Sequence, residues 1–148
     1  MTEFLYVDAR RVFWVGPLTI VTSVIAVLAV REVAMWMIHP PPRFEPLTVG
    51  PPIFDTILGC VGAILVFACL DSVRTYRRVA AVVLILSFIP DVLLATSHEM
   101  GATWPEAFFL MTMHVVVWAI CVTLLPGLSM TRSVESTVKP ENPLSIKL

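Results

Sequence analysis

Four apolar stretches, each long enough to cross a lipid bilayer, dominate this sequence. About 20 consecutive apolar residues in a helix span the hydrocarbon core of a membrane. Of the 148 residues, 57% are hydrophobic and only 14% are charged, whereas soluble domains carry about 25% charged residues. The bilayer core offers the backbone no hydrogen-bonding partners, so each stretch must satisfy its own backbone as a helix. We therefore expect an all-α, integral membrane four-transmembrane-helix bundle.

The expected spans cover residues 12–38, 53–70, 79–97 and 106–125, within one membrane domain of residues 1–128. Two arginines before the first span suit a secretory signal, but the uncharged run that follows exceeds the core of about 7 to 15 residues that a signal has. We expect an uncleaved first span. Residues 129–148, rich in Ser, Lys, Glu and Pro, are expected to form a mobile cytoplasmic tail.

The links between the spans differ in character. Residues 39–52 hold six prolines, so we expect a stiff, extended and non-helical loop. Within it, the run from Val49 to Pro52 is typical of a helix start and not of a phosphate loop, because prolines lack the N–H donors that such a loop needs. Residues 71–78 are expected to be a short charged link.

Prolines and glycines mark further points along the spans. Pro90 predicts a kink in the third span, because its ring removes one backbone hydrogen bond. Pro126 and Gly127 are expected to end the fourth span. In the second span, Gly59, Gly62 and Ala63 are small enough to allow another helix to approach closely.

The distribution of Lys and Arg predicts the orientation, since positive residues are retained on the cytoplasmic side of a membrane. Only Arg31 and Arg43 fall on one side of the expected spans. The other side holds the remaining basic residues, Arg10, Arg11, Arg74, Arg77, Arg78, Arg132, Lys139 and Lys147. We therefore expect both termini to be cytoplasmic, in a multi-pass protein of the inner (plasma) membrane.

Two ionisable residues, Asp91 and His114, lie inside the expected spans. Such a group costs roughly 2.5 to 3.5 kcal/mol at the centre of a membrane helix, so it needs a partner, a water-filled cavity or a function. Counting along each helix places Asp91 about 10 Å and His114 about 12 Å below the outer surface. The third and fourth spans are antiparallel neighbours, so we predict a hydrogen bond between these two side chains.

Other polar residues fall on the same outer side and could form a cup open to the outside. The candidate ligand-binding set is Asp91, His114, Glu106, Glu32, Asp55, Arg31 and His98. Such a cup could bind a cation or a polar headgroup, relay protons, or perform acid and base chemistry. The alternative is structural: the Asp and His satisfy one another and fix the packing of two helices, while Arg31 neutralises a neighbouring acid.

Metal and cofactor sites find little support in the sequence. Asp91, His98, Glu99 and His114 have suitable ligand types, but no His-x-x-x-His or Glu-x-x-His spacing accompanies them. Haem ligation by the two histidines is disfavoured because their expected depths differ. We expect no metal site, and no cofactor is indicated.

The three cysteines, Cys60, Cys69 and Cys121, all lie in apolar stretches. They form no Cys-x-x-Cys pair, and their odd number argues against a disulfide framework or a thiol-redox enzyme. We expect them to act as small buried hydrophobic residues.

A set of short motifs between Thr48 and Leu128 resembles a family of small bacterial four-helix membrane proteins classed as a domain of unknown function. The matching pieces lie at the ends of the spans and within the last two of them: Val49, Gly50 and Pro51; Leu70 before an arginine-rich link; Leu86 and Ser87 before a proline; Met113 and His114; and Leu125, Pro126 and Gly127. The resemblance implies four-span topology and brings no activity with it.

The function we expect is that of a small accessory or interaction subunit, because short loops leave little room for a catalytic domain. Its expected partners are the lipid bilayer and a membrane protein or further copies of the chain. A net charge of −1, with no basic block between aromatics, argues against nucleic acid. The alternative is a pocket protein, in which Asp91 and His114 handle protons, the outer acids attract a polar or cationic ligand, and the proline loop covers the mouth.

Overall fold

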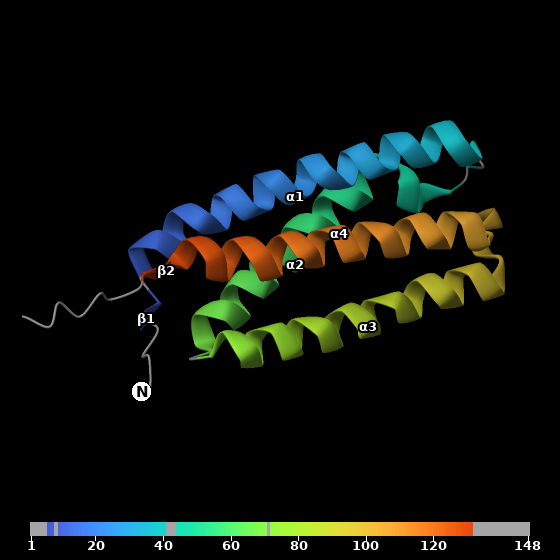
Figure 1. Cartoon of the computed structure of the whole chain (residues 1–148). Coiled ribbons are helices and arrows are strands. Elements are labelled where there is room, and N and C mark those ends of the chain that lie inside the picture. Colours follow the sequence, from blue (N-terminus) through green and yellow to red (C-terminus); the bar gives the residue numbers. More distant parts are fainter. Residues whose placement is uncertain (1–5, 8, 41–43, 71, 132–148) are drawn as a thin grey trace, which may run out of the picture.

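The computed structural model describes residues 6, 7, 9–40, 44–70 and 72–131. This part of the chain contains four α-helices, α1 (Ala9–Ile38), α2 (Gly50–Cys69), α3 (Val73–Ser97) and α4 (Trp104–Ser129). All four are long and apolar enough to cross a membrane (Figure 1). The prediction of an all-helical protein with four candidate membrane spans is confirmed.

Helix α4 is the one on which the others assemble. It packs along α1 on one side and α3 on another, and it also contacts α2. Figure 1 shows α1 and α4 side by side over most of their length. Apolar residues occur all round α4, as expected of a helix surrounded by others within a membrane.

Two clusters of buried side chains lie along the bundle. The terminal-end cluster, near the two chain ends, draws on all four helices and contains Val15, Cys60, Phe67, Tyr76, Cys121, Val122 and Leu125. The loop-end cluster, at the opposite end, contains Val27, Ala34, Phe44, Leu47, Ala102 and Met113.

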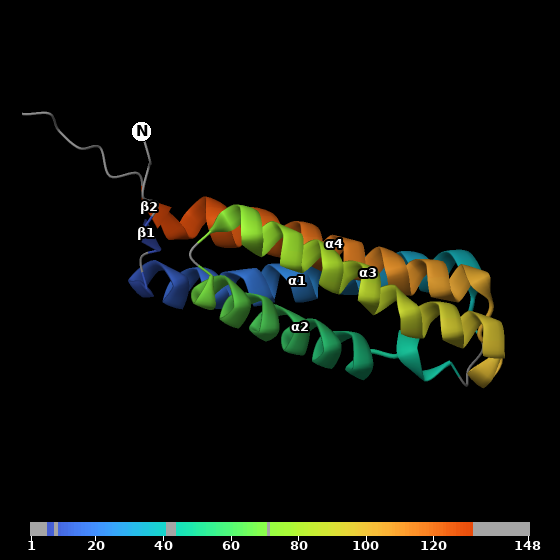
Figure 2. The same ribbon diagram turned by 90° about the horizontal axis from the view of Figure 1, so that it is seen from below.

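Helix α2 contributes to only one of these clusters. Its side chains enter the terminal-end cluster, whereas the loop-end cluster receives Phe44 and Leu47 from the segment before α2. Leu47 belongs to the short 3-10 helix η1 (Glu45–Leu47). Figures 1 and 2 show that α2 and α3 are neighbours at the link joining them and separate toward the other end. Near the loops, η1 takes the place that α2 leaves.

The two ends of the membrane domain meet. The short strand β1 (Tyr6–Val7) pairs antiparallel with β2 (Met130–Thr131), with Tyr6 opposite Thr131. The first and last helices therefore begin and end at the same end of the bundle. Of the predicted mobile tail of residues 129–148, Ser129 belongs to α4 and Met130–Thr131 form β2, and residues 132–148 lie outside the described residues.

The proline-rich segment differs from the prediction of a non-helical loop, which is wrong for two parts of it. Pro46 lies inside η1, and Pro51 and Pro52 lie in the first turn of α2. Prolines are accepted at these positions because the first N–H groups of a helix have no internal partner. The predicted helix start at residues 49–52 is thus present.

Two other predicted boundaries are wrong. Helix α3 begins at Val73, so Arg74, Arg77 and Arg78 lie in its first turns and not in a link. Long arginine side chains permit this, since they can reach the membrane surface from a helix end. Helix α4 continues through Pro126 to Ser129, because a membrane helix tolerates proline where neighbouring groups satisfy the backbone.

Close helix packing occurs at a different glycine from those predicted. A Cβ added to Gly59 or Gly62 would meet no atom within 4 Å, whereas one added to Gly16 of α1 would lie 3.3 Å from Cδ1 of Ile64. The prediction is wrong for these two glycines, because it rested on residue size without knowledge of which face of α2 meets α1, whereas Ala63 does pack against the terminal-end cluster. At Gly16, α1 and the side chain of Ile64 from α2 are in close contact.

Replacing Gly16 with leucine should therefore destabilise the bundle by about 1 to 3 kcal/mol, because the larger side chain overpacks the contact with Ile64. Gly59→Leu is the matched control, with open space around it and little expected effect. Thermal unfolding in mild detergent measures both. A larger loss of stability in Gly59→Leu than in Gly16→Leu would contradict this account of how α2 packs.

Candidate functional site

Asp91 of α3 and His114 of α4 approach one another, as predicted from their depths. Asp91 is 6% exposed, and its Oδ2 lies 3.4 Å from Nε2 of His114. This is an ion-pair distance, but Oδ2 has no hydrogen-bond partner among the described residues. The predicted hydrogen bond is therefore not formed, and the carboxylate oxygen stays unsatisfied inside the bundle.

The imidazole of His114 lies against α3, beside Asp91 and Phe88, on a face of α4 that meets α2 further along the helix. Cys121, seven residues further along α4 and hence on nearly the same face, contacts Cys60 of α2. The His114 side chain is nevertheless 38% exposed. Because α2 diverges from the bundle toward the loop end, it leaves this face of α4 partly uncovered. The ring of Phe88 lies beside the imidazole, 6.5 Å between centroids.

His98 does not join this pair. Helix α3 ends at Ser97, and His98 adopts a left-handed conformation with φ 54°, which few non-glycine residues adopt. Its Nδ1 lies 3.3 Å from the carbonyl oxygen of Ala102, so the ring closes the turn between α3 and α4. His98 could face the same way as Asp91 only if α3 continued past it, and α3 ends one residue earlier.

Glu106 acts on its own helix and not in a cup. Its carboxylate accepts a hydrogen bond from the backbone N–H of Thr103 at 3.0 Å and another from the Thr103 hydroxyl. With Thr103 preceding α4 and Glu106 in its first turn, this is half of a capping box. The Thr-x-x-Glu spacing before an apolar run is a sequence signal that could have identified this role.

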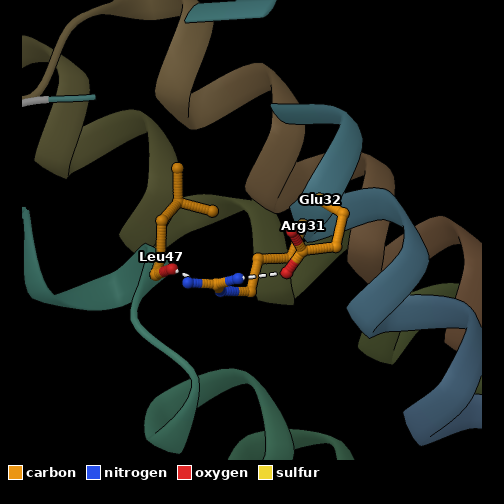
Figure 3. Close-up of polar contacts among 3 residues, drawn as sticks. All are labelled: Arg31, Glu32 and Leu47. Carbon is orange, nitrogen blue, oxygen red and sulfur yellow. Dashed lines mark hydrogen bonds and ion pairs between the residues drawn. The ribbon is translucent and has the colours of Figure 1, made fainter. Parts of the chain in front are cut away.

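Arg31 holds η1 against α1. Its Nε donates a hydrogen bond of 2.8 Å to the carbonyl oxygen of Leu47, and its Nη1 pairs with the Glu32 carboxylate. Figure 3 shows the guanidinium extended between these two partners. Arg31 is mostly buried while Glu32 is 71% exposed. The contact of Arg31 with Leu47 is therefore better shielded from solvent than its ion pair with Glu32.

The predicted cup is thus not assembled as one site. Asp55 is exposed and forms no ion pair with another described residue. Glu106 and His98 are engaged in local contacts, and Arg31 pairs with its neighbour Glu32. Among the described residues, Asp91 and His114 are the members of the set that contact one another from two different helices. Within the described residues, no three His, Cys, Asp or Glu side chains are placed to hold a metal ion.

One cluster was missed by the sequence analysis. Cys60 and Cys121 are both buried, and their Sγ atoms lie 3.9 Å apart. No local motif marks this pair, because 61 positions separate the two residues. Only the packing of α2 on α4 brings them together.

Comparisons of the sequence with protein-family models, curated proteins and solved structures gave no match. The resemblance to a bacterial four-helix family of unknown function therefore stays a prediction. The site is interpreted below from its own chemistry.

Replacing Arg31 with alanine should loosen η1, because the Leu47 carbonyl loses its charged donor, at a cost of about 1 to 3 kcal/mol. The amide of Thr48, which donates to the Glu45 carbonyl at 2.9 Å, is a convenient reporter. Its hydrogen exchange should become faster in Arg31→Ala. Glu32→Gln is the control, and equal acceleration in both variants would mean that the surface pair, not the Leu47 contact, holds η1.

Replacing Glu106 with alanine should destabilise the start of α4 by about 1 kcal/mol, the usual effect of losing a cap. The change should be visible as faster hydrogen exchange at Thr103 and a lower melting temperature. Glu99→Ala, at an exposed position in the preceding turn, should leave both unchanged. Unaltered exchange at Thr103 in Glu106→Ala would argue against the capping role.

Proposed function

We propose that this protein is a small accessory subunit of a bacterial plasma membrane, which binds a second membrane protein through the side of α4 that carries His114. The observation that supports the proposal is the half-exposed imidazole beside an unsatisfied Asp91 oxygen, within the apolar length of two candidate membrane helices. In hydrocarbon such groups are costly unless another polar group meets them.

The partner chemistry follows from this pair. Asp91 of α3 lies 3.4 Å from Nε2 of the imidazole and attracts its protonated form, without a hydrogen bond between the two. The rest of the ring is then available to a polar side chain on a neighbouring membrane helix. Interhelical contacts of this kind contribute about 1 to 2 kcal/mol at most, so the apolar surroundings of His114 must supply the remaining affinity.

The orientation of the bundle supports a cytoplasmic location for both termini. Arg74, Arg77 and Arg78 lie at the start of α3, at the same end as the paired strands β1 and β2. At the opposite end Arg31 is engaged by Leu47 and Glu32. Since exposed positive residues are retained in the cytoplasm, we assign the terminal end to that side.

The second candidate is a proton-handling pocket, favoured by the placement of a buried acid next to a partly exposed base. Here a proton reaches Asp91 through His114, and the α2-facing side of α4 admits water or a small polar ligand. The arrangement of the two groups, one buried and one exposed, is what such a relay needs. This candidate does not include the outer acids. Glu32 and Glu106 make local contacts, and Asp55 is exposed.

His114→Ala should reduce the amount of co-purifying partner by about tenfold, the equivalent of about 1.4 kcal/mol. Val115→Ala is the matched control, because Val115 is 42% exposed on another face of the same turn. Native mass spectrometry of the protein, extracted gently at natural expression level, measures the stoichiometry. Equal recovery of partner with both variants would contradict the accessory role through this face.

The pair Asp91→Asn and His114→Gln separates the two candidates. Both substitutions retain hydrogen-bonding capacity and remove the charge and the basicity. The double variant should keep its partner if the pair serves recognition. It should lose proton transfer, measured with a pH-sensitive dye in proteoliposomes, if the pair serves as a relay.

A further inference from the structure

The cysteine pair at the centre of the terminal-end cluster is not used by the proposed function. Cys60 comes from α2 and Cys121 from α4, both are buried, and their sulfurs are 3.9 Å apart. Tyr76 of α3 and Val15 of α1 belong to the same cluster. The two thiols are therefore in contact at a point where all four helices meet.

We propose that Cys60 and Cys121 form a reversible disulfide, and that the oxidant is a quinone dissolved in the bilayer. A disulfide has a sulfur–sulfur distance of about 2.05 Å, so the sulfurs must approach by roughly 2 Å from their present contact. We expect rotation of the two side chains, with a small shift of α2, to bring the sulfurs together, because α2 enters only one of the two buried clusters.

The burial of the thiols supports an oxidant of this class. Both sulfurs lie within helices of membrane-spanning length, where water-soluble oxidants have poor access and an apolar quinone is concentrated. Buried hydroxyls are also at hand: those of Tyr76 and Ser23 have no hydrogen-bond partner among the described residues, and Ser23 neighbours the Cys60 thiol. These hydroxyls can donate hydrogen bonds to a thiolate sulfur as its proton leaves.

The reaction balances as a two-electron transfer. Two S–H bonds break and one S–S bond forms, while two protons and two electrons reduce the quinone to its hydroquinone. A dithiol reverses the step by exchange through a mixed disulfide. The new bond joins α2 to α4 next to the place where α2 leaves the bundle, so oxidation limits how far α2 can move.

The test uses the full chain in lipid nanodiscs. Decylubiquinone is added, because its fully substituted ring resists addition of thiols, and the protein is then unfolded in detergent with polyethylene-glycol maleimide. Before oxidation all three cysteines should react. Afterwards only Cys69, which is exposed near the end of α2, should react, and the chain should remain monomeric without reductant.

Each other outcome contradicts a stated part of the proposal. Three reactive thiols after the quinone, with one after the general thiol oxidant diamide, would exclude the quinone as oxidant. Three reactive thiols after both reagents would exclude the disulfide. A disulfide-linked dimer formed through Cys69, with the other two thiols still reactive, would also exclude it.

Matched variants identify the residues. Cys69→Ser retains the buried pair. Both of its thiols should react with the maleimide before oxidation, and neither should react afterwards. Cys60→Ser and Cys121→Ser should each keep both remaining thiols reactive. Size exclusion shows which of these two variants is folded, because a folded variant elutes at the wild-type volume. In a folded variant, loss of reactivity at the remaining buried thiol after addition of the quinone would contradict the pairing.

Discussion

The architecture depends on the burial of α4 by the three other helices. Within a bilayer, lipid covers apolar side chains as well as protein does, so helices associate through packing and a few polar contacts. Helix α4 supplies both. Its apolar surface enters the two buried clusters, and it carries His114, which contacts α3, and Cys121, which contacts α2. The polar pair and the cysteine pair both therefore depend on how this one helix is covered.

The incomplete coverage of α4 is the feature that connects structure to function. Helix α2 enters only the terminal-end cluster, and at the loop end Phe44 and Leu47 fill the interior instead. Those two side chains pack around Met113 and leave the neighbouring His114 half uncovered. A polar site is therefore retained inside an otherwise apolar bundle. The same divergence gives α2 the freedom that closure of the thiol pair requires.

The sequence predicted the helices and one contact of the site, and the reasons are physical. Long apolar stretches have only one way to satisfy their backbone in a membrane, and a fixed rise per residue places Asp91 and His114 at one depth. Glu106 was misassigned because a hydrogen bond within its own turn engages its carboxylate. The contact of Cys60 with Cys121 could not be predicted, because helices that are apolar all round carry no periodic signal for their rotation.

The order of packing also has a consequence for how the protein is made. Helix α1 makes extensive contacts with α4, yet α4 is synthesised after the other three helices. The pairs α1–α2 and α3–α4 can associate soon after each second helix enters the membrane, but the interface between α1 and α4 must wait until α4 is made. During that interval the face of α1 that later contacts α4 is exposed to lipid or to assembly factors of the membrane. A ribosome stalled before α4 would therefore hold an open half-bundle, whose lifetime is set by translation and not by folding.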